Sequence, residues 1–164
     1  MNKQLLMYFG IAVVVVGVAV FVAVNGNKGS HLRLDGKILK VRTGPLGEGN
    51  SIAVLDFRVT NPSDIPFVVG NVELSLETKD GKMVDGVTVA KSDLKQVFAY
   101  NRFLGDEYNE GLTIKDTIAP HATVDRMVAA HFEVGDKDLD ASKAVHLTLT
   151  DVDGPTWETS GSIQ

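Results

Sequence analysis

The feature that most constrains this chain is an uninterrupted apolar run near its start, LLMYFGIAVVVVGVAVFVAV, at Leu5–Val24. Its twenty residues carry no charge, and its most polar side chain is that of Tyr8. A helix of this length rises about 30 Å, close to the hydrocarbon thickness of a bilayer. A cleaved signal peptide is the competing interpretation, but its apolar core is usually about 7–15 residues long and precedes an Ala-x-Ala site. We therefore predict one uncleaved N-terminal transmembrane helix within residues 1–24.

The rest of the chain divides into a spacer and one domain. Residues 25–30, NGNKGS, are polar and glycine-rich, which is typical of a flexible linker. Residues 31–164 have the length of a single domain. The sequence therefore predicts a membrane anchor, a linker and one folded domain, but it does not predict the oligomeric state.

The charges beside the apolar run bear on which side of the membrane the domain occupies. One cationic side chain precedes the run, and five follow it closely: Lys28, Arg33, Lys37, Lys40 and Arg42. Counted literally, this distribution favours a cytoplasmic domain, but the positive-inside rule applies to short loops rather than to long folded domains. We expect a single-pass protein whose domain is extracytoplasmic, in the periplasm at a bacterial inner membrane or at the cell surface.

The whole-chain charge bears on partners. The formal net charge is −5, a sign that works against binding nucleic acid. The chain has no cysteine, so disulfides and thiolate metal sites are excluded. No motif indicates a cofactor. The membrane, through residues 5–24, and an envelope protein are the partners we expect.

Alternating apolar and polar residues predict an all-β domain. In Ile52–Thr60 the residues Ala53, Leu55, Phe57 and Val59 alternate with Val54, Asp56, Arg58 and Thr60, so we expect one buried and one solvated face. Turn signals recur every 8–12 residues or so, as in an antiparallel β-sandwich of immunoglobulin-like type. The other predicted strands lie in Leu32–Thr43, Val68–Thr78, Met83–Ala90, Leu112–Ile118, Thr123–Val134, Ala144–Thr150 and around Trp157.

One segment breaks this pattern. Ser92 is a candidate N-cap, and apolar residues then recur at helical spacing, which predicts a short inserted helix over Asp93–Tyr100. Aromatic residues are densest here, and four of them are candidates for binding a partner: Phe98, Tyr100, Phe103 and Tyr108. The alternative is that these aromatics, like Trp157, serve as core or as cover for the sandwich.

Three aspartates form the strongest metal-like cluster. Asp136, Asp138 and Asp140 alternate along a predicted loop, Gly135–Ser142, and carboxylates suit Ca²⁺. The EF-hand pattern fails, because Ala141 stands where it needs glycine and Leu147 where it needs glutamate. The alternative is a solvated acidic loop, so we predict no metal site and keep these residues as weak candidates.

The histidines give little indication of a metal site or of catalysis. His131 and His146 both fall on the predicted outer face of their strands, where a pair could bind a metal, but no third ligand has a recognisable spacing. His121 has no evident serine and carboxylate partners, and the chain lacks a Gly-x-Ser-x-Gly elbow. We therefore predict that the protein is not an enzyme.

Three stretches carry a family resemblance: Phe57–Lys82, with its Asn-Pro turn, Ile118–Val134, with Pro120, and Leu147–Gly154. They resemble the immunoglobulin-like sandwich of bacterial membrane-anchored proteins of unknown function, and distantly the WHy-type late-embryogenesis-abundant domain. The resemblance implies a fold and an envelope setting, and it carries no catalytic residue.

The expected function is a membrane-tethered, non-catalytic module that binds or spaces another envelope component. The alternatives are an envelope hydrolase with a loop-borne active site and a Ca²⁺-binding sandwich.

Overall fold

The structure, a computed structural model, describes residues 13–18 and 33–163. The chain divides into two compact units, residues 1–31 and residues 32–164. Of the predicted membrane helix, residues 13–18 are described and are helical; its remainder and the linker at 25–30 lie outside the described residues. Across the described ranges, no helix combines the length and the apolar character that crossing a bilayer requires.

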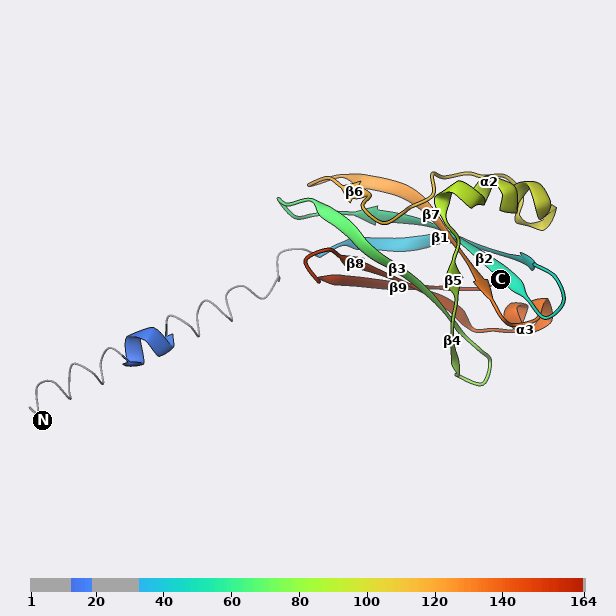
Figure 1. Ribbon diagram of the computed structural model, residues 1–164, viewed down its shortest axis with the longest axis horizontal. Helices are drawn as coiled ribbons and strands as arrows, with labels where there is room; N and C mark the ends of the chain where they lie inside the picture. The colour runs from blue at the N-terminus through green and yellow to red at the C-terminus, as the bar shows by residue number, and fades with distance from the viewer. Residues whose placement is uncertain (1–12, 19–32, 164) are drawn as a thin grey trace, which may run out of the picture. The chain divides into compact units, whose positions relative to one another are not determined.

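The larger unit is a sandwich of two antiparallel sheets (Figure 1). The first sheet has the strand order β1 (Asp35–Pro45), β2 (Ser51–Thr60), β7 (Thr123–Phe132) and β5 (Val87–Thr88). The second has the order β4 (Met83–Asp85), β3 (Phe67–Glu77), β8 (Ala144–Asp151) and β9 (Thr156–Ser162), and β6 (Thr117–Ile118) pairs with the start of β3. The helical segments are α2 (Lys91–Tyr100), η1 (Arg102–Leu104) and α3 (Asp136–Asp140).

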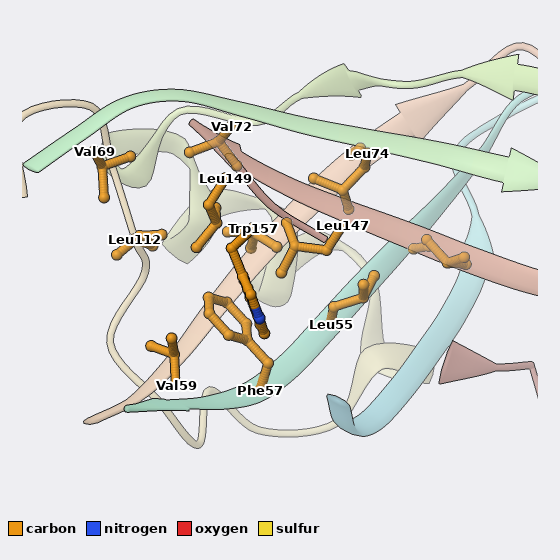
Figure 2. Close-up of a cluster of buried hydrophobic side chains, with 14 of the residues drawn as sticks. Leu55, Phe57, Val59, Val69, Val72, Leu74, Leu112, Leu147, Leu149 and Trp157 are labelled. Carbon is orange, nitrogen blue, oxygen red and sulfur yellow. The ribbon is translucent and has the colours of Figure 1, made fainter. Parts of the chain in front are cut away.

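The main core lies between the inner faces of the sheets, as the alternation predicts. Phe57 from the first sheet packs against Trp157 from the second, with ring centroids 6.3 Å apart (Figure 2). Trp157 is thus a core residue, 9% exposed. The inward register of the long strands is confirmed for Ala53, Leu55, Phe57, Val59, Val72, Leu74, Leu76, Val128, Ala130, Phe132, Val145, Leu147 and Leu149.

The domain has two distinct ends. β1 begins at Asp35, which pairs with Thr60, and ends at Pro45, which pairs with Ser51. We call the first the entry end, because the chain enters the sandwich there, and the second the far end. At about 3.4 Å per residue, β1 separates the two by about 34 Å. The loop at 46–50, α3 and the last turn of α2 all lie at the far end (Figure 1).

The predicted strand Met83–Ala90 is not continuous. β4 pairs with β3 in the second sheet, whereas β5 pairs with β7 in the first. Gly86 stands between them, and its N–H donates to the Leu74 carbonyl at 2.8 Å. A Cβ at Gly86 would lie 2.7 Å from the Phe132 ring, so glycine lets the chain cross between the sheets here.

Three other predicted boundaries are wrong. Within the predicted strand Leu112–Ile118, only β6 is a strand. Just before this range, Gly111 makes an isolated bridge to Met127. The predicted acidic loop Gly135–Ser142 contains α3. The helix α2 begins two residues earlier than expected, with Ala90 at the N-cap and no side-chain cap, because the Ser92 hydroxyl bonds to Asp93 instead.

Candidate partner-binding surface

Residues 91–111, which contain the predicted inserted helix and which we call the insertion, cover the outer face of the first sheet (Figure 1). Leu94 of α2 and Leu104 of η1 are buried there, in a second core separate from the main one. The sheet contributes side chains that the alternation assigns to solvent: Ile52, Val54, Met127 and Ala129. The expectation of one wet face on β2 is therefore wrong, because the insertion shields that face from water.

A buried ion pair holds this insertion in place. On the outer face of the first sheet, Arg42 of β1 lies 2.7 Å from the Asp56 carboxylate of β2, and both side chains are at most 6% exposed. Arg42 Nη1 also donates to the carbonyls of Leu104, at 2.6 Å, and Asp106, at 2.7 Å. Asn109 donates to the other Asp56 oxygen at 2.8 Å. The two charges thus satisfy backbone and side-chain groups of the insertion.

Two of the four candidate aromatics take part in the same cluster. The Arg42 guanidinium lies 5.0 Å from the centroid of the Phe98 ring and 5.1 Å from that of Tyr108. Lys40 lies 5.4 Å from the Tyr108 ring as well. Both distances to Arg42 are within the range of cation–π attraction. Phe98 is half-buried and covers Arg42, whereas Tyr108 is exposed. That either residue binds a partner stays a prediction.

The remaining two aromatics are free. Tyr100 and Phe103 are each 81% exposed, and together with Arg102 they form what we call the aromatic tip. Buried Asn101 fixes the backbone between them, because its side chain donates to the Pro45 carbonyl at 2.7 Å and accepts from the Phe103 N–H at 3.1 Å. A shallow hollow of about 400 Å³ lies between the tip and the turn at Pro45 and Gly47. The tip is therefore anchored at the far end of the sandwich.

The three candidate metal ligands do not alternate along a loop. They lie on α3, where residues two apart point in different directions. Asp140 accepts a hydrogen bond from the Thr43 hydroxyl at 2.9 Å. Within residues 13–18 and 33–163, no group of three histidine or carboxylate side chains is arranged to hold a metal ion.

The histidines are dispersed. His131 lies on β7 and His146 on β8, in different sheets, so they do not form the histidine pair that was considered from the sequence. His131 hydrogen-bonds to Asn50 at 3.0 Å, and His146 lies 3.5 Å from Glu77. His121 lies 2.9 Å from exposed Asp64 at the entry end, and no serine hydroxyl in the described part of the chain hydrogen-bonds to it.

Two exposed ion pairs perturb carboxylates on or beside the first sheet. Arg58 donates twice to Asp125, and these hydrogen bonds lower the pKa of Asp125 and raise that of Arg58. The hydrogen bond from Lys91 similarly lowers the pKa of Glu110, with a smaller contribution from the charge of Arg126. Both contacts are solvated, so they influence local titration rather than the anchoring of the insertion.

Sequence reasoning missed the residues that hold the insertion: Arg42, Asp56, Asn101 and Asn109. The sequence does contain one indication for Asp56, which is a lone carboxylate in the apolar run IAVLDFRV. If the outer face of that strand is covered, the carboxylate is buried and needs a charged or hydrogen-bonding partner. Nothing local marks Arg42, whose contacts with the insertion span more than sixty residues of sequence.

No protein-family model matches the chain, and no curated protein matches it. Among solved structures, it is similar to an uncharacterised β-sandwich protein from Clostridium difficile 630, with 14% identity and a TM-score of 0.42, over 78% of this chain and 85% of that one. It is also similar to the Iho670 flagellar-like filament, with 10% identity and a TM-score of 0.35, over 99% of this chain and 97% of that one. Both TM-scores are low, and the two sheets themselves define the fold.

Proposed function

We propose that this protein is a membrane-tethered, non-catalytic module that binds an envelope protein through its aromatic tip. The observation that carries the proposal is the exposure of Tyr100 and Phe103, 81% each, on a segment that a buried ion pair fixes to the sandwich. Aromatic and arginine side chains dominate the binding energy of protein interfaces. Rigid presentation lowers the entropy lost when a partner is bound.

The tether is the second part of the proposal. The apolar run at residues 5–24 is long enough to span a bilayer as one helix, and the resemblance to bacterial membrane-anchored sandwich proteins agrees with an extracytoplasmic domain. The chain enters the domain at the entry end, and the tip lies about 34 Å away along β1. The tip therefore lies at the end of the sandwich opposite the strand terminus at which the chain enters it.

Cross-linking in intact membranes tests this function. The full-length protein is compared with a double variant, Tyr100→Ala with Phe103→Ala, in cells that normally make it. Because both side chains are exposed and make little core contact, we expect the variant to fold normally and to lose the partner that the wild type recovers.

The matched control removes exposed apolar side chains elsewhere: Ile65→Ala with Ile114→Ala. These residues are 50% and 53% exposed and lie outside the insertion, on segments that flank the start of β3. The control should recover the partner as the wild type does. Recovery of the same proteins by the wild type and the tip variant, with no difference in phenotype, would overturn the proposal.

A further inference from the structure

The aromatic tip lies on a part of the chain with an excess of carboxylates. The segments that carry and border the tip, residues 46–50 and 100–108, are called the tip-forming segments, and they contain Glu48, Asp106 and Glu107 against the single guanidinium of Arg102. Beside them α3 adds Asp136, Asp138 and Asp140 against Lys137, and the hydrogen bond from Thr43 to Asp140 ties α3 to β1 at this end.

These charges amount to a large part of the electrostatics of the chain. The two segments contribute a net charge of −2 and α3 another −2, compared with −5 for the whole sequence. Among the ion pairs of the described residues, none involves any of these six carboxylates. Lys79 and Lys82 line a hollow with Asp138, and Lys40 lies over the Tyr108 ring, so these lysines offset part of the negative charge. Residues 46–50 and 100–108 keep an excess of carboxylates, which favours a cationic partner over an anionic one at the tip.

The insertion already shows how its aromatic rings bind a cation. Phe98 and Tyr108 lie at 5.0 and 5.1 Å from Arg42, with the Asp56 carboxylate completing the site. Tyr100 and Phe103 have no such guanidinium over them among the cation–π contacts of the described chain, and their rings are open to solvent. Exposed rings on segments that carry an excess of carboxylates offer the same kinds of group on the outside of the insertion.

We propose that the aromatic tip binds a cationic protein segment, with an arginine or lysine side chain stacked on Tyr100 or Phe103 and paired with the surrounding carboxylates. The inference deepens the proposed function and rests on it. Arg102 is the one opposing charge in the tip-forming segments, and three carboxylates outnumber it there. A partner recognised in this way binds through charge and ring faces, so its affinity falls as ionic strength rises.

The test uses the full-length protein in detergent micelles and two synthetic peptides. The first is acetyl-Gly-Ser-Arg-Gly-Arg-Ser-Gly-amide, and the second has both arginines replaced by citrulline, which keeps the shape and removes the charge. We expect the arginine peptide to shift the NMR signals of the Tyr100 and Phe103 rings. We also expect it to bind at least tenfold more tightly than the citrulline peptide and to weaken at least tenfold between 50 and 500 mM salt, in line with charge screening.

Two variants separate stacking from apolar contact and from charge. Tyr100→Leu with Phe103→Leu keeps an apolar surface but removes the ring faces, and should weaken the arginine peptide at least fivefold. Asp106→Asn with Glu107→Gln should weaken it to a similar extent, whereas Glu158→Gln, on the second sheet outside the tip, should have no effect.

Equal binding of the two peptides, or no binding of either, overturns the cationic partner. So does undiminished binding of the arginine peptide by the leucine variant. The proposed function stands or falls separately: if the alanine variant of the tip still loses its cross-linked partner while the arginine peptide fails, the tip binds a partner of other chemistry. If the alanine variant also keeps its partner, both proposals are overturned.

Discussion

Arg42 is the residue on which the candidate surface depends. Its guanidinium bonds to Asp56, to two carbonyls of the insertion and to the Met127 sulfur, which lies 3.4 Å away. A buried pair of this kind is weak evidence of net stabilisation, because both ions lose their hydration. Its importance lies in what happens when one partner is removed: the other charge is left buried and uncompensated.

Replacing Arg42 with methionine should therefore destabilise the protein strongly. Arg42→Met leaves the Asp56 carboxylate buried with Asn109 alone, so we expect a loss of about 3–5 kcal/mol in the free energy of unfolding. The single tryptophan, Trp157, is buried and reports unfolding in urea by fluorescence. Amides in the insertion should also exchange faster with solvent.

Arg58→Met provides the comparison for that experiment. Arg58 also pairs with an aspartate across strands, but the Arg58 side chain is 51% exposed and that of Asp125 is 35% exposed. Its loss should change the stability far less than the loss of Arg42. Equal effects of the two substitutions would show that burial of the Arg42 pair is not what fixes the insertion.

The exposed pair of Arg58 and Asp125 should make the stability of the folded state depend on pH. Because Arg58 lowers the pKa of Asp125, the ionised carboxylate stabilises the folded state at pH values above the ordinary aspartate pKa, about 3.9. This contribution disappears as the pH falls through the lowered pKa of the folded state. In Arg58→Met, the Asp125 midpoint should rise toward the ordinary value in a carboxyl NMR titration.

Glu110 is the internal control for the titration. Its pKa is lowered by Lys91 and Arg126, which Arg58→Met leaves in place, so its midpoint should not move. An Asp125 midpoint that is identical in the wild type and the variant would contradict the assigned cause.

At the scale of elements, the crossing from β4 to β5 depends on Gly86. Gly86→Ala would place its Cβ within 2.9 Å of both Phe132 and the Ala130 methyl, inside the core. Overpacking of this kind typically costs about 1–3 kcal/mol. We expect a loss of stability in that range, measured by urea unfolding and accompanied by faster amide exchange in β5.

Gly135→Ala is the matched control. Gly135 has a φ of −66°, which alanine adopts readily, and an added Cβ would come no closer than 3.8 Å to Asp138. Because Gly135 is the N-cap of α3, where alanine is less favourable than glycine, we expect a loss of no more than about 1 kcal/mol. A Gly86→Ala protein as stable as Gly135→Ala would show that the crossing tolerates a side chain.

Strand β2 shows which parts of the fold the sequence predicts and which it does not. The alternation in Ile52–Thr60 predicts the inward face correctly, because period two follows from strand geometry alone. It assigns Val54 and Asp56 to solvent, and both are buried, because the insertion that covers them lies about forty residues further along the chain. No local pattern encodes that contact.

In the candidate site, too, the local sequence predicts some features and tertiary packing decides the others. Local aromatic density marks Phe98, Tyr100 and Phe103 alike as candidates, but Tyr100 and Phe103 are exposed whereas Phe98 is half-buried over Arg42. What separates these residues is the tertiary docking of α2. The crossing at Gly86 and the helical turn at Asp136–Asp140 are equally tertiary outcomes, since both segments have residues compatible with other local structures.

At the scale of the whole molecule, the proposed membrane tether predicts on which side of the membrane the sandwich lies. If residues 5–24 span the membrane with the short N-terminal segment inside, the whole sandwich lies on the outer side of that membrane. Trypsin added to intact spheroplasts should then cleave the domain or its linker. Lys28 lies in the predicted linker, and Lys79 and Lys82 are exposed at the turn between β3 and β4.

The sidedness is decided by comparing digestion before and after lysis. A cytoplasmic marker protein must remain intact in the unlysed sample, and the protein must stay with the membrane fraction at alkaline pH, as a spanning helix requires. Complete protection until lysis would place the sandwich in the cytoplasm, as the literal count of flanking charges suggests. The aromatic tip would then face cytoplasmic proteins, so this measurement determines in which compartment a cationic partner should be sought.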